Sequence, residues 1–179
     1  MTEDFLAVVE TKRFLGREFL TWLVHRLETA GGRIAEDGVV VELALGDRVV
    51  LAGGPPDEAR TTVVGAGDLG AEIGAGLRRG KLLDRAALVM THGERRWELT
   101  LDGGLLAFDG LRCPPLGERG DRTDPRAARE NDLFLRLADV EQVLGVVDRL
   151  FAEFCTVRSG RGWAGRELPA LRAWVEGLR

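Results

Sequence analysis

A repeat of large apolar residues in the last third of the chain constrains the fold more than any other feature. The repeat alternates spacings of four and three residues, through Leu133, Leu137, Val140, Leu144, Val147, Phe151 and Phe154. This is the a/d spacing of a helix that packs against a helical neighbour. It predicts a long helix, which we expect to begin at Pro125 with Asp124 as its N-cap. The apolar stripe packs either on the protein's own sheet and first helix or on a second copy, as a dimer seam.

Two further helices are predicted near the ends of the chain. The first has an apolar face at helical spacings, formed by Phe19, Leu20, Leu23 and Leu27. Gly31-Gly32 ends this helix, and a start near Phe5 or near Leu15 is compatible with the pattern. Gly16 favours the later start, because glycine inside a helix costs about 1 kcal/mol relative to alanine. After a break at residues 159–162, a short final helix is expected from about Glu167.

The middle of the chain alternates strand-like runs with glycine-rich turns. A hairpin around Gly46-Asp47 is predicted from the two alternating runs that flank it. A short helix ending near Gly80 is predicted from Leu69, Ile73 and Leu77. The predicted strands are 39–45, 48–52, 60–64, 82–91, 95–101 and 105–112. Short turns between successive strands indicate a mostly antiparallel sheet of about six strands, and the whole chain, 1–179, is expected to form one α+β domain.

Composition narrows the class of protein. Apolar residues make up 45% and charged residues 30% of the chain, as in globular domains. No window approaches 18 consecutive apolar residues, which argues against a membrane span. The acidic start, Met1–Asp4, does not resemble a secretory signal. Cys113 and Cys155 are expected to be free thiols in a reducing cytoplasm. With His25 and His92 they lack any zinc-ligand spacing, so no metal is expected.

The segment Gly65–Gly70 is the motif closest to an enzyme signature. It follows a β-branched run and opens a helix, as a dinucleotide-binding fingerprint does. Asp68 would place negative charge beside the phosphates, and hairpins flank the segment where a dinucleotide-binding sheet needs repeated crossovers. A nucleotide-using enzyme is therefore the third hypothesis. We expect no cofactor and no catalysis.

The basic residues give a stronger indication of function than any possible catalytic group, because they could bind nucleic acid. They form three groups in the sequence, Arg78, Arg79, Lys81 and Arg85, then Arg95 and Arg96, then Arg158 and Arg161. Arginines at helix ends and turns can reach phosphates, and the nearby Trp163 could stack on a base. The alternative is that they are ordinary solvated arginines. The net charge of −4 argues against binding nucleic acid through overall charge, so DNA binding would need a local basic strip.

Two stretches of the chain resemble RdgC-type recombination-associated proteins. The first is Phe14–Leu23, with the sequence FLGREFLTWL, and the second is the order of features from about Ala75 to Phe154. The resemblance covers about residues 14–156, which correspond to the later part of such a chain. It implies a non-catalytic dimeric ring that holds duplex DNA without reading sequence and restrains the RecA recombinase at the nucleoid. Arg78 and Arg79 with the Gly80-Lys81 step are the charged feature that maps onto the family.

Sequence-independent DNA binding linked to recombination is thus the leading hypothesis. The alternative is a protein-interaction or scaffold domain that binds no nucleic acid, which the apolar stripe and the acidic balance favour. A homodimer fits either hypothesis.

Overall fold

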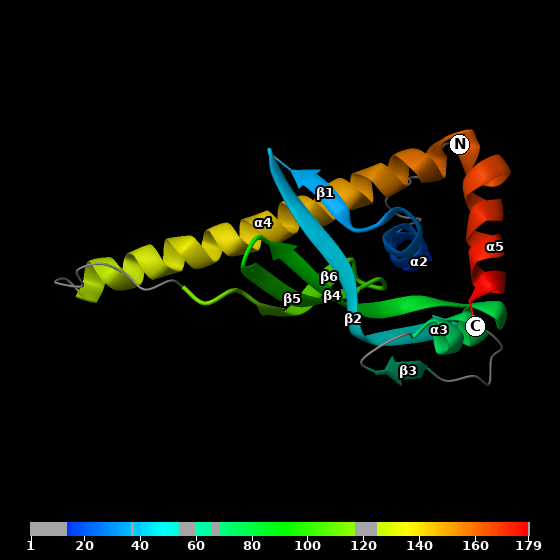
Figure 1. The fold of residues 1–179 in the computed structure, drawn as a ribbon, viewed down its shortest axis with the longest axis horizontal. Helices are drawn as coiled ribbons and strands as arrows, with labels where there is room; N and C mark the ends of the chain where they lie inside the picture. The colour runs from blue at the N-terminus through cyan, green and yellow to red at the C-terminus, as the bar shows by residue number, and fades with distance from the viewer. Residues whose placement is uncertain (1–13, 37, 54–59, 66–68, 117–124, 179) are drawn as a thin grey trace, which may run out of the picture.

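The computed structural model describes residues 14–36, 38–53, 60–65, 69–116 and 125–178 of an α+β protein (Figure 1). Six strands form one sheet in the order β1-β2-β4-β5-β6, with β3 also pairing to β2, and every one of these pairs is antiparallel. The strands are β1 (Arg33–Glu36), β2 (Val39–Gly53), β3 (Thr61–Val64), β4 (Lys81–His92), β5 (Arg95–Asp102) and β6 (Ala107–Arg112). The described helices are α2 (Phe14–Ala30), α3 (Gly70–Arg78), α4 (Pro125–Ser159) and α5 (Leu168–Gly177), with a π-helical turn, η1 (Trp163–Glu167). The predicted fold class, with its N-terminal, long and short final helices, is confirmed.

The predicted hairpin around Gly46-Asp47 is wrong. β2 continues through these residues and pairs with β4 on both sides of them, with Leu45 opposite Leu88 and Val49 opposite Ala86. The register shift between those pairs is a bulge, which uses the same small and polar residues as a turn but bends the strand instead of reversing it. β1, which was not predicted, forms the real hairpin with β2.

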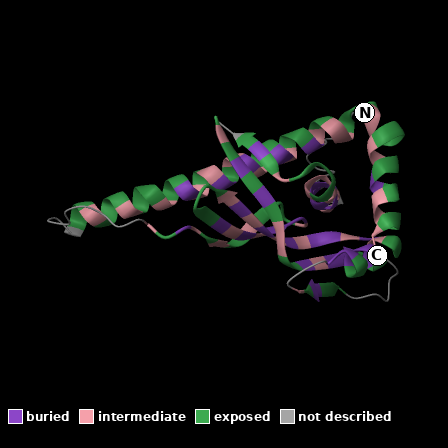
Figure 2. Ribbon diagram, viewed as in Figure 1, coloured by how far each residue is buried: buried purple, intermediate pink, exposed green. Residues whose placement is uncertain are grey.

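Burial alternates along β2, β4 and β5, so their buried side chains lie mainly on one face of the sheet, where they share a core with the helices. Figure 2 shows the buried residues recurring along these strands and along the second half of α4. α2 and α4 meet over this face, where the ring centroid of Phe19 lies 5.2 Å from that of Phe151 and 5.6 Å from that of Phe154. α3 extends the layer, because a Cβ on its Gly76 would lie 3.0 Å from the Leu51 side chain. The alternate residues of β2, β4 and β5 form an opposite, open face with exposed and half-buried side chains.

The first half of α4 extends beyond the sheet (Figures 1 and 2). From residue 126 to residue 138 none of its residues is buried, whereas Asp139, Val143, Val146, Leu150 and Phe154 are. At 1.5 Å per residue this exposed part is roughly 20 Å long. Neither α4 nor any other described helix is long and apolar enough to cross a membrane.

α5 is held against α2 and α3 by polar contacts at its C-terminal end. The indole Nε1 of Trp174 donates to Glu28 at 2.8 Å, and Arg78 donates from Nη1 to the main-chain oxygens of Val175 and Leu178, each at 2.9 Å. These bonds satisfy carbonyl groups that a helix leaves unpaired at its end.

The imidazole of His25 lies in this contact and predicts a pH dependence of stability. Its ring centroid is 5.3 Å from that of Trp174, and burial lowers its pKa below the usual 6.5, although Glu167 and Glu28 act in the opposite direction. The unfolded chain then binds the proton more readily, so stability present above pH 6.5 is lost as the pH falls through the lowered pKa. We expect His25→Gln to reduce the loss of melting temperature between about pH 7 and pH 5. Equal losses in the variant and the parent would contradict this.

Candidate functional site

The polar residues of the Phe14–Leu23 segment attach α2 to the sheet. A Cβ on Gly16 would lie 2.1 Å from the main-chain oxygen of Gly103, so the helix backbone touches the turn after β5. The next residue, Arg17, donates from Nε to Oδ1 of Asp84 at 2.6 Å. Asp84 is the extra residue of a second bulge, because Arg85 and Leu83 face consecutive residues of β2.

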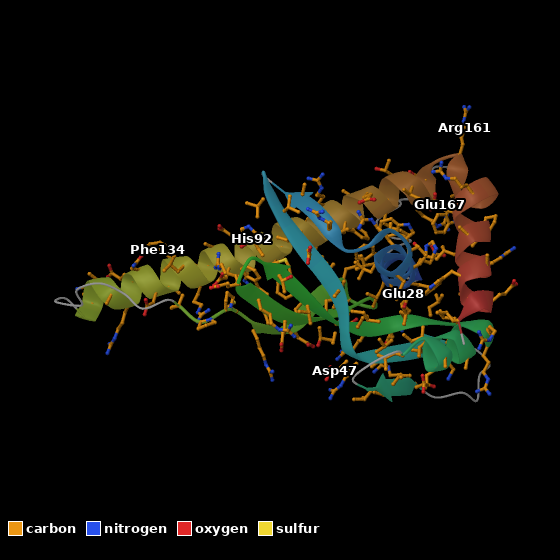
Figure 3. All side chains as sticks on the ribbon, in the orientation of Figure 1. Glu28, Asp47, His92, Phe134, Arg161 and Glu167 are labelled. Carbon is orange, nitrogen blue, oxygen red and sulfur yellow. The ribbon has the colours of Figure 1, made fainter. Side chains whose placement is uncertain are left out.

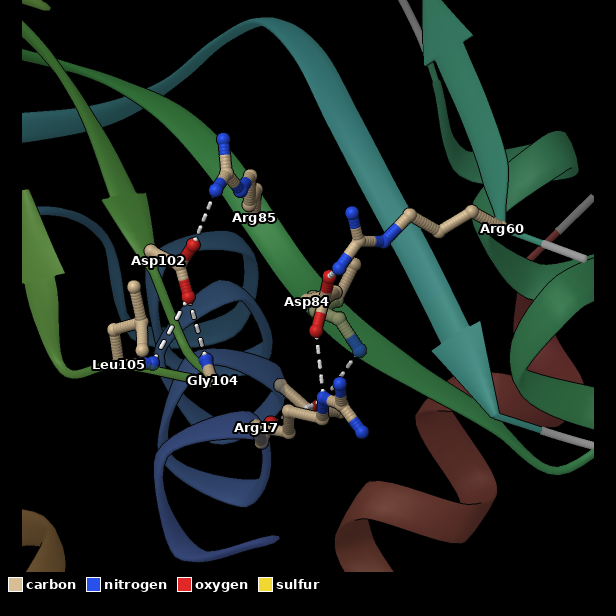
Figure 4. A network of polar contacts seen from close by, with 9 residues as sticks. Arg17, Arg60, Asp84, Arg85, Asp102, Gly104 and Leu105 are labelled. Atoms are coloured by element: carbon tan, nitrogen blue, oxygen red, sulfur yellow. Dashed lines mark hydrogen bonds and ion pairs between the residues drawn. The ribbon is translucent and has the colours of Figure 1, made fainter. Parts of the chain in front are cut away.

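Asp84 belongs to a network of buried carboxylates and arginines that joins α2, β4 and β5 (Figure 4). Arg60 Nη2 lies 2.9 Å from Oδ2 of Asp84, and Arg85 Nη2 lies 2.7 Å from Oδ2 of Asp102. Asp102 also accepts the main-chain N–H groups of Gly104 and Leu105. Both carboxylates are less than 10% exposed, and buried charges need such partners. The arginine pairing gives this cluster a structural role.

The next residue of the segment, Glu18, binds the end of α4. Its Oε2 accepts from Nε of Arg158 at 2.8 Å, and the same guanidinium lies 4.9 Å from the ring centroid of Trp163. The segment that carries the family resemblance therefore places its glycine and both charged side chains in contacts within this fold.

Most of the arginines predicted to bind DNA already have partners. Arg95 pairs with the buried carboxylate of Asp139 and lies over the Trp97 ring. Arg96 lies 3.0 Å from Glu98. Lys81 is 5% exposed and donates to the Thr61 hydroxyl at 2.8 Å, so its ammonium is not presented at the surface. With Arg78, Arg85 and Arg158, whose bonds are given above, six of the eight predicted residues contribute contacts within the fold.

Arg79 and Arg161 differ from the other six. Both are exposed, and the described residues offer neither of them an ion pair. Arg161 extends outward at the corner between α4 and α5 (Figure 3). Arg78, Arg79 and Lys81 lie at or before the start of β4, and Arg95 and Arg96 follow its far end, roughly 40 Å from Lys81 for a strand of 12 residues, with Arg85 between them. The predicted basic groups therefore do not gather as whole groups, although Arg85 and Arg96 both line the open face of the sheet.

The open face of the sheet gathers arginines that sequence reasoning only half identified. A groove of about 680 Å³ across β2, β4, β5 and β6 is lined by Arg48, Arg96 and Arg112, together with Asp47 and Glu98. A smaller groove of about 220 Å³ beside it is lined by Arg48 and by the predicted Arg85. Arg48 and Arg112 were missed because only the correct strand pairing places them on this face.

α4 carries two apolar faces, and only one of them packs on the body. The body face is formed by Val143, Val146, Leu150 and Phe154. The first four residues of the predicted stripe, Leu133 to Leu144, are centred roughly 110° round the helix from that face at 100° per residue, and its last residue, Phe154, belongs to the body face. Its C-terminal members, Val147 and Phe151, are partly buried against the core, and Phe154 is buried completely.

The N-terminal members of the stripe are exposed instead. Leu133 is 60% exposed, Leu137 48% and Leu144 40%, and the adjoining Phe134 is 68% exposed. Val140 between them is half-buried. Phe134 lies on the part of α4 that extends past the sheet (Figure 3). Packing on the protein's own body therefore accounts for the stripe from Val147 onward and leaves its first half uncovered by described residues.

The Gly65–Gly70 segment enters the connection from β3 to β4, and its residues 66–68 lie outside the described part. β3 and β4 both pair antiparallel with β2 and so run parallel on either side of it. In a dinucleotide-binding sheet the two strands joined by the glycine-rich segment are parallel neighbours. Here β2 lies between β3 and β4, so this arrangement is absent from the described strands. In α3 itself, a Cβ on Gly74 would lie 2.7 Å from Cβ of Leu178, so this glycine allows close packing on α5.

Comparison with known proteins finds no matching family model, no significantly similar curated protein and no significantly similar solved structure. Within the described ranges, no three His, Cys, Asp or Glu side chains come together as a metal site. Cys113 and Cys155 are free thiols, and burial raises the pKa of Cys155. Two features of the described part of the chain offer surfaces for a partner: the exposed half of the α4 stripe and the arginines of the open sheet face.

Proposed function

We propose that this protein is a non-enzymatic protein-association module that binds its partner through the α4 stripe, defined here as Leu133, Phe134, Leu137, Val140 and Leu144. The observation that carries the proposal is the 40–68% exposure of its four largest side chains, three of which, Leu133, Phe134 and Leu137, lie on the part of α4 without a buried residue, 126–138. Contiguous exposed apolar surface marks interaction sites. Burying such a side chain contributes about 1.5–3 kcal/mol, so several together can hold a partner.

The spacing of the stripe supports a helical partner. Leu133, Leu137, Val140 and Leu144 keep the a/d alternation of four and three residues, which presents a continuous ridge to a second helix. A projecting helix gains little stability from its own body, because helices in proteins depend on packing of an apolar face. A partner on this ridge would supply that packing.

Site-specific photo-crosslinking in cells tests the proposal. We expect benzoylphenylalanine in place of Phe134 to crosslink to a protein partner, because position 134 lies at the edge of the ridge. The same group in place of Ala44, an exposed position on the open sheet face, is the matched control. Equal yields of crosslinked protein at the two positions would contradict the proposal.

Duplex DNA binding is a second candidate, favoured by the arginines of the open sheet face. Arg48, Arg85, Arg96 and Arg112 line its two adjoining grooves, and the resemblance to RdgC-type proteins implies sequence-independent binding with a recombinase link. Glu98 and Asp109 pair with three of these arginines, so phosphates would compete with carboxylates. This competition is why we place DNA binding second.

Fluorescence anisotropy with a random-sequence duplex tests this candidate at about 50 and 200 mM salt, since affinity that depends on several phosphate contacts falls steeply over that span. We expect Arg48→Glu/Arg112→Glu to abolish binding if the open face is the site. Arg79→Glu/Arg161→Glu is the matched charge change at two exposed positions predicted from sequence. Absence of binding by the parent protein at the lower salt would eliminate the candidate.

A further inference from the structure

We propose that the partner on the α4 stripe is a second copy of this chain, with the two α4 helices paired in parallel and in register. The inference rests on the proposed function, because it names the occupant of the same surface. It is carried by the charges that border the stripe and by the direction in which the stripe faces.

The a/d alternation fixes which residues border the seam. With Leu137 and Leu144 at a positions and Leu133 and Val140 at d positions, the g positions are Arg129 and Arg136. The e positions on the other side of the ridge are Phe134 and Glu141. One border of the ridge is therefore basic, and the other is aromatic and acidic.

A parallel copy matches these borders. In a parallel pair each g residue lies beside the e residue five positions later in the other helix. Arg136 then meets Glu141 of the second copy, and the two-fold axis repeats this ion pair. Arg129 meets Phe134 of the second copy, where a guanidinium over an aromatic ring is favourable. An antiparallel copy would instead place g beside g, arginine against arginine.

The side chains that would form the pair are accessible. Glu141 is exposed, and the side chain of Arg136 is 39% exposed. Arg136 already donates from Nη1 to the main-chain oxygen of Pro114 at 2.6 Å, and the same nitrogen lies 3.5 Å from Oδ2 of the buried Asp139. A guanidinium has five N–H donors in a planar fork, and both existing contacts use Nη1, so its other N–H groups can hold the carboxylate of Glu141 from the second copy.

The direction of the stripe leaves room for the copy. The face of α4 that packs on the body lies roughly 110° from the stripe, so a helix on the stripe does not displace the sheet. A two-fold axis parallel to the helices places the two bodies on opposite sides of the seam, with the same surface used by both copies. The seam ends near Val147, the next residue of the apolar repeat after the stripe, which is partly buried against the core.

Sedimentation equilibrium of the full chain tests self-association. We expect a dimer that Leu137→Asp converts to a monomer, with an unchanged melting transition at the concentration where the parent is monomeric, because Leu137 is 48% exposed. Glu141→Arg places arginine against Arg136 and should weaken the dimer roughly tenfold, from two pairs at up to about 1 kcal/mol each. A mixture of Glu141→Arg with Arg136→Glu restores both pairs and should recover the heterodimer.

Disulfide trapping decides the orientation independently, since Arg136→Glu also alters contacts within its own chain. Leu133→Cys and Leu144→Cys should each form a same-residue disulfide dimer on oxidation, with the parent chain as the control for Cys113 and Cys155. Disulfides formed only when the two variants are mixed would show an antiparallel pair and overturn the inference.

A monomeric parent whose position 134 crosslinks to a different protein would overturn the inference of a second copy, while the proposed function stands. A monomer without crosslinks at position 134 would overturn both.

Discussion

Replacing Arg17 by methionine is expected to lower the free energy of unfolding by about 3 kcal/mol, because it leaves a carboxylate buried without its nearest cation. The side chain of Asp84 is 2% exposed and lies 2.6 Å from Nε of Arg17. Arg60 remains 2.9 Å from the other oxygen, but its side chain is 60% exposed and largely hydrated. Methionine keeps much of the apolar stem, so the change removes mainly the charge. Urea denaturation measures the effect as a shift of the midpoint at constant slope.

Two further variants show whether the loss of stability in Arg17→Met comes from the buried ion pair and not from the loss of an arginine in general. Arg166 has a side chain 79% exposed and pairs with its neighbour Glu167, so Arg166→Met should change stability by less than about 0.5 kcal/mol. The double variant Arg17→Met/Asp84→Leu removes both charges and should recover part of the loss, since an apolar pair can replace a buried ion pair. If Arg17→Met changed the midpoint no more than Arg166→Met, Asp84 would not depend on this pair.

Periodicity predicted the elements whose structure depends on near neighbours in the sequence. α4 and β5 each have a regular spacing of apolar residues, and the bounds predicted for them from the sequence are close to those in the structure. β2 was misjudged, because Gly46-Asp47 is suited to a turn and to a bulge alike. The choice between them is made by β4, which lies more than 30 residues later and pairs with both halves of β2. Local sequence does not contain that information.

The stripe of α4 was found from the sequence, but its exposure was not. The helix has apolar residues on two neighbouring faces, one led by Leu137 and Leu144 and the other by Val143 and Val146. A spacing pattern identifies each face without saying which one the body covers. That depends on where the long helix crosses α2, which is set by the contact of Phe154 with the first helix.

The basic groups show a third limit of sequence reasoning. Arginines near one another in the sequence were grouped, yet their carboxylate partners come from distant segments. Arg95 pairs with Asp139 across 44 residues, and Arg158 pairs with Glu18 across 140. Charge counts along a chain cannot reveal such pairs. A group that appears free to bind phosphate in the sequence can therefore be a set of internal ion pairs in the fold.

Replacing Gly16 by alanine is expected to destabilise the protein by about 2 kcal/mol, opposite in sign to the usual effect of this change in a helix. Alanine inside a helix is ordinarily more stable than glycine by about 1 kcal/mol. Here the new Cβ would lie 2.1 Å from the main-chain oxygen of Gly103 and 2.9 Å from a methyl carbon of Leu106. The nearest atom belongs to the backbone, so α2 must move away from the turn. Overpacking of this kind typically costs 1–3 kcal/mol.

The same substitution at Gly165 provides the matched control for the steric argument. No atom lies within 4 Å of a Cβ built there, and the residue is exposed in η1. Thermal or urea unfolding of Gly165→Ala should show no loss of stability, whereas Gly16→Ala should unfold earlier. A Gly16→Ala protein at least as stable as its parent would mean that α2 is not in contact with the β5–β6 turn.

Since Arg17 is adjacent to Gly16, any outward shift of the helix start would also lengthen the 2.6 Å contact between Arg17 and Asp84. The two substitutions should therefore be less than additive when combined.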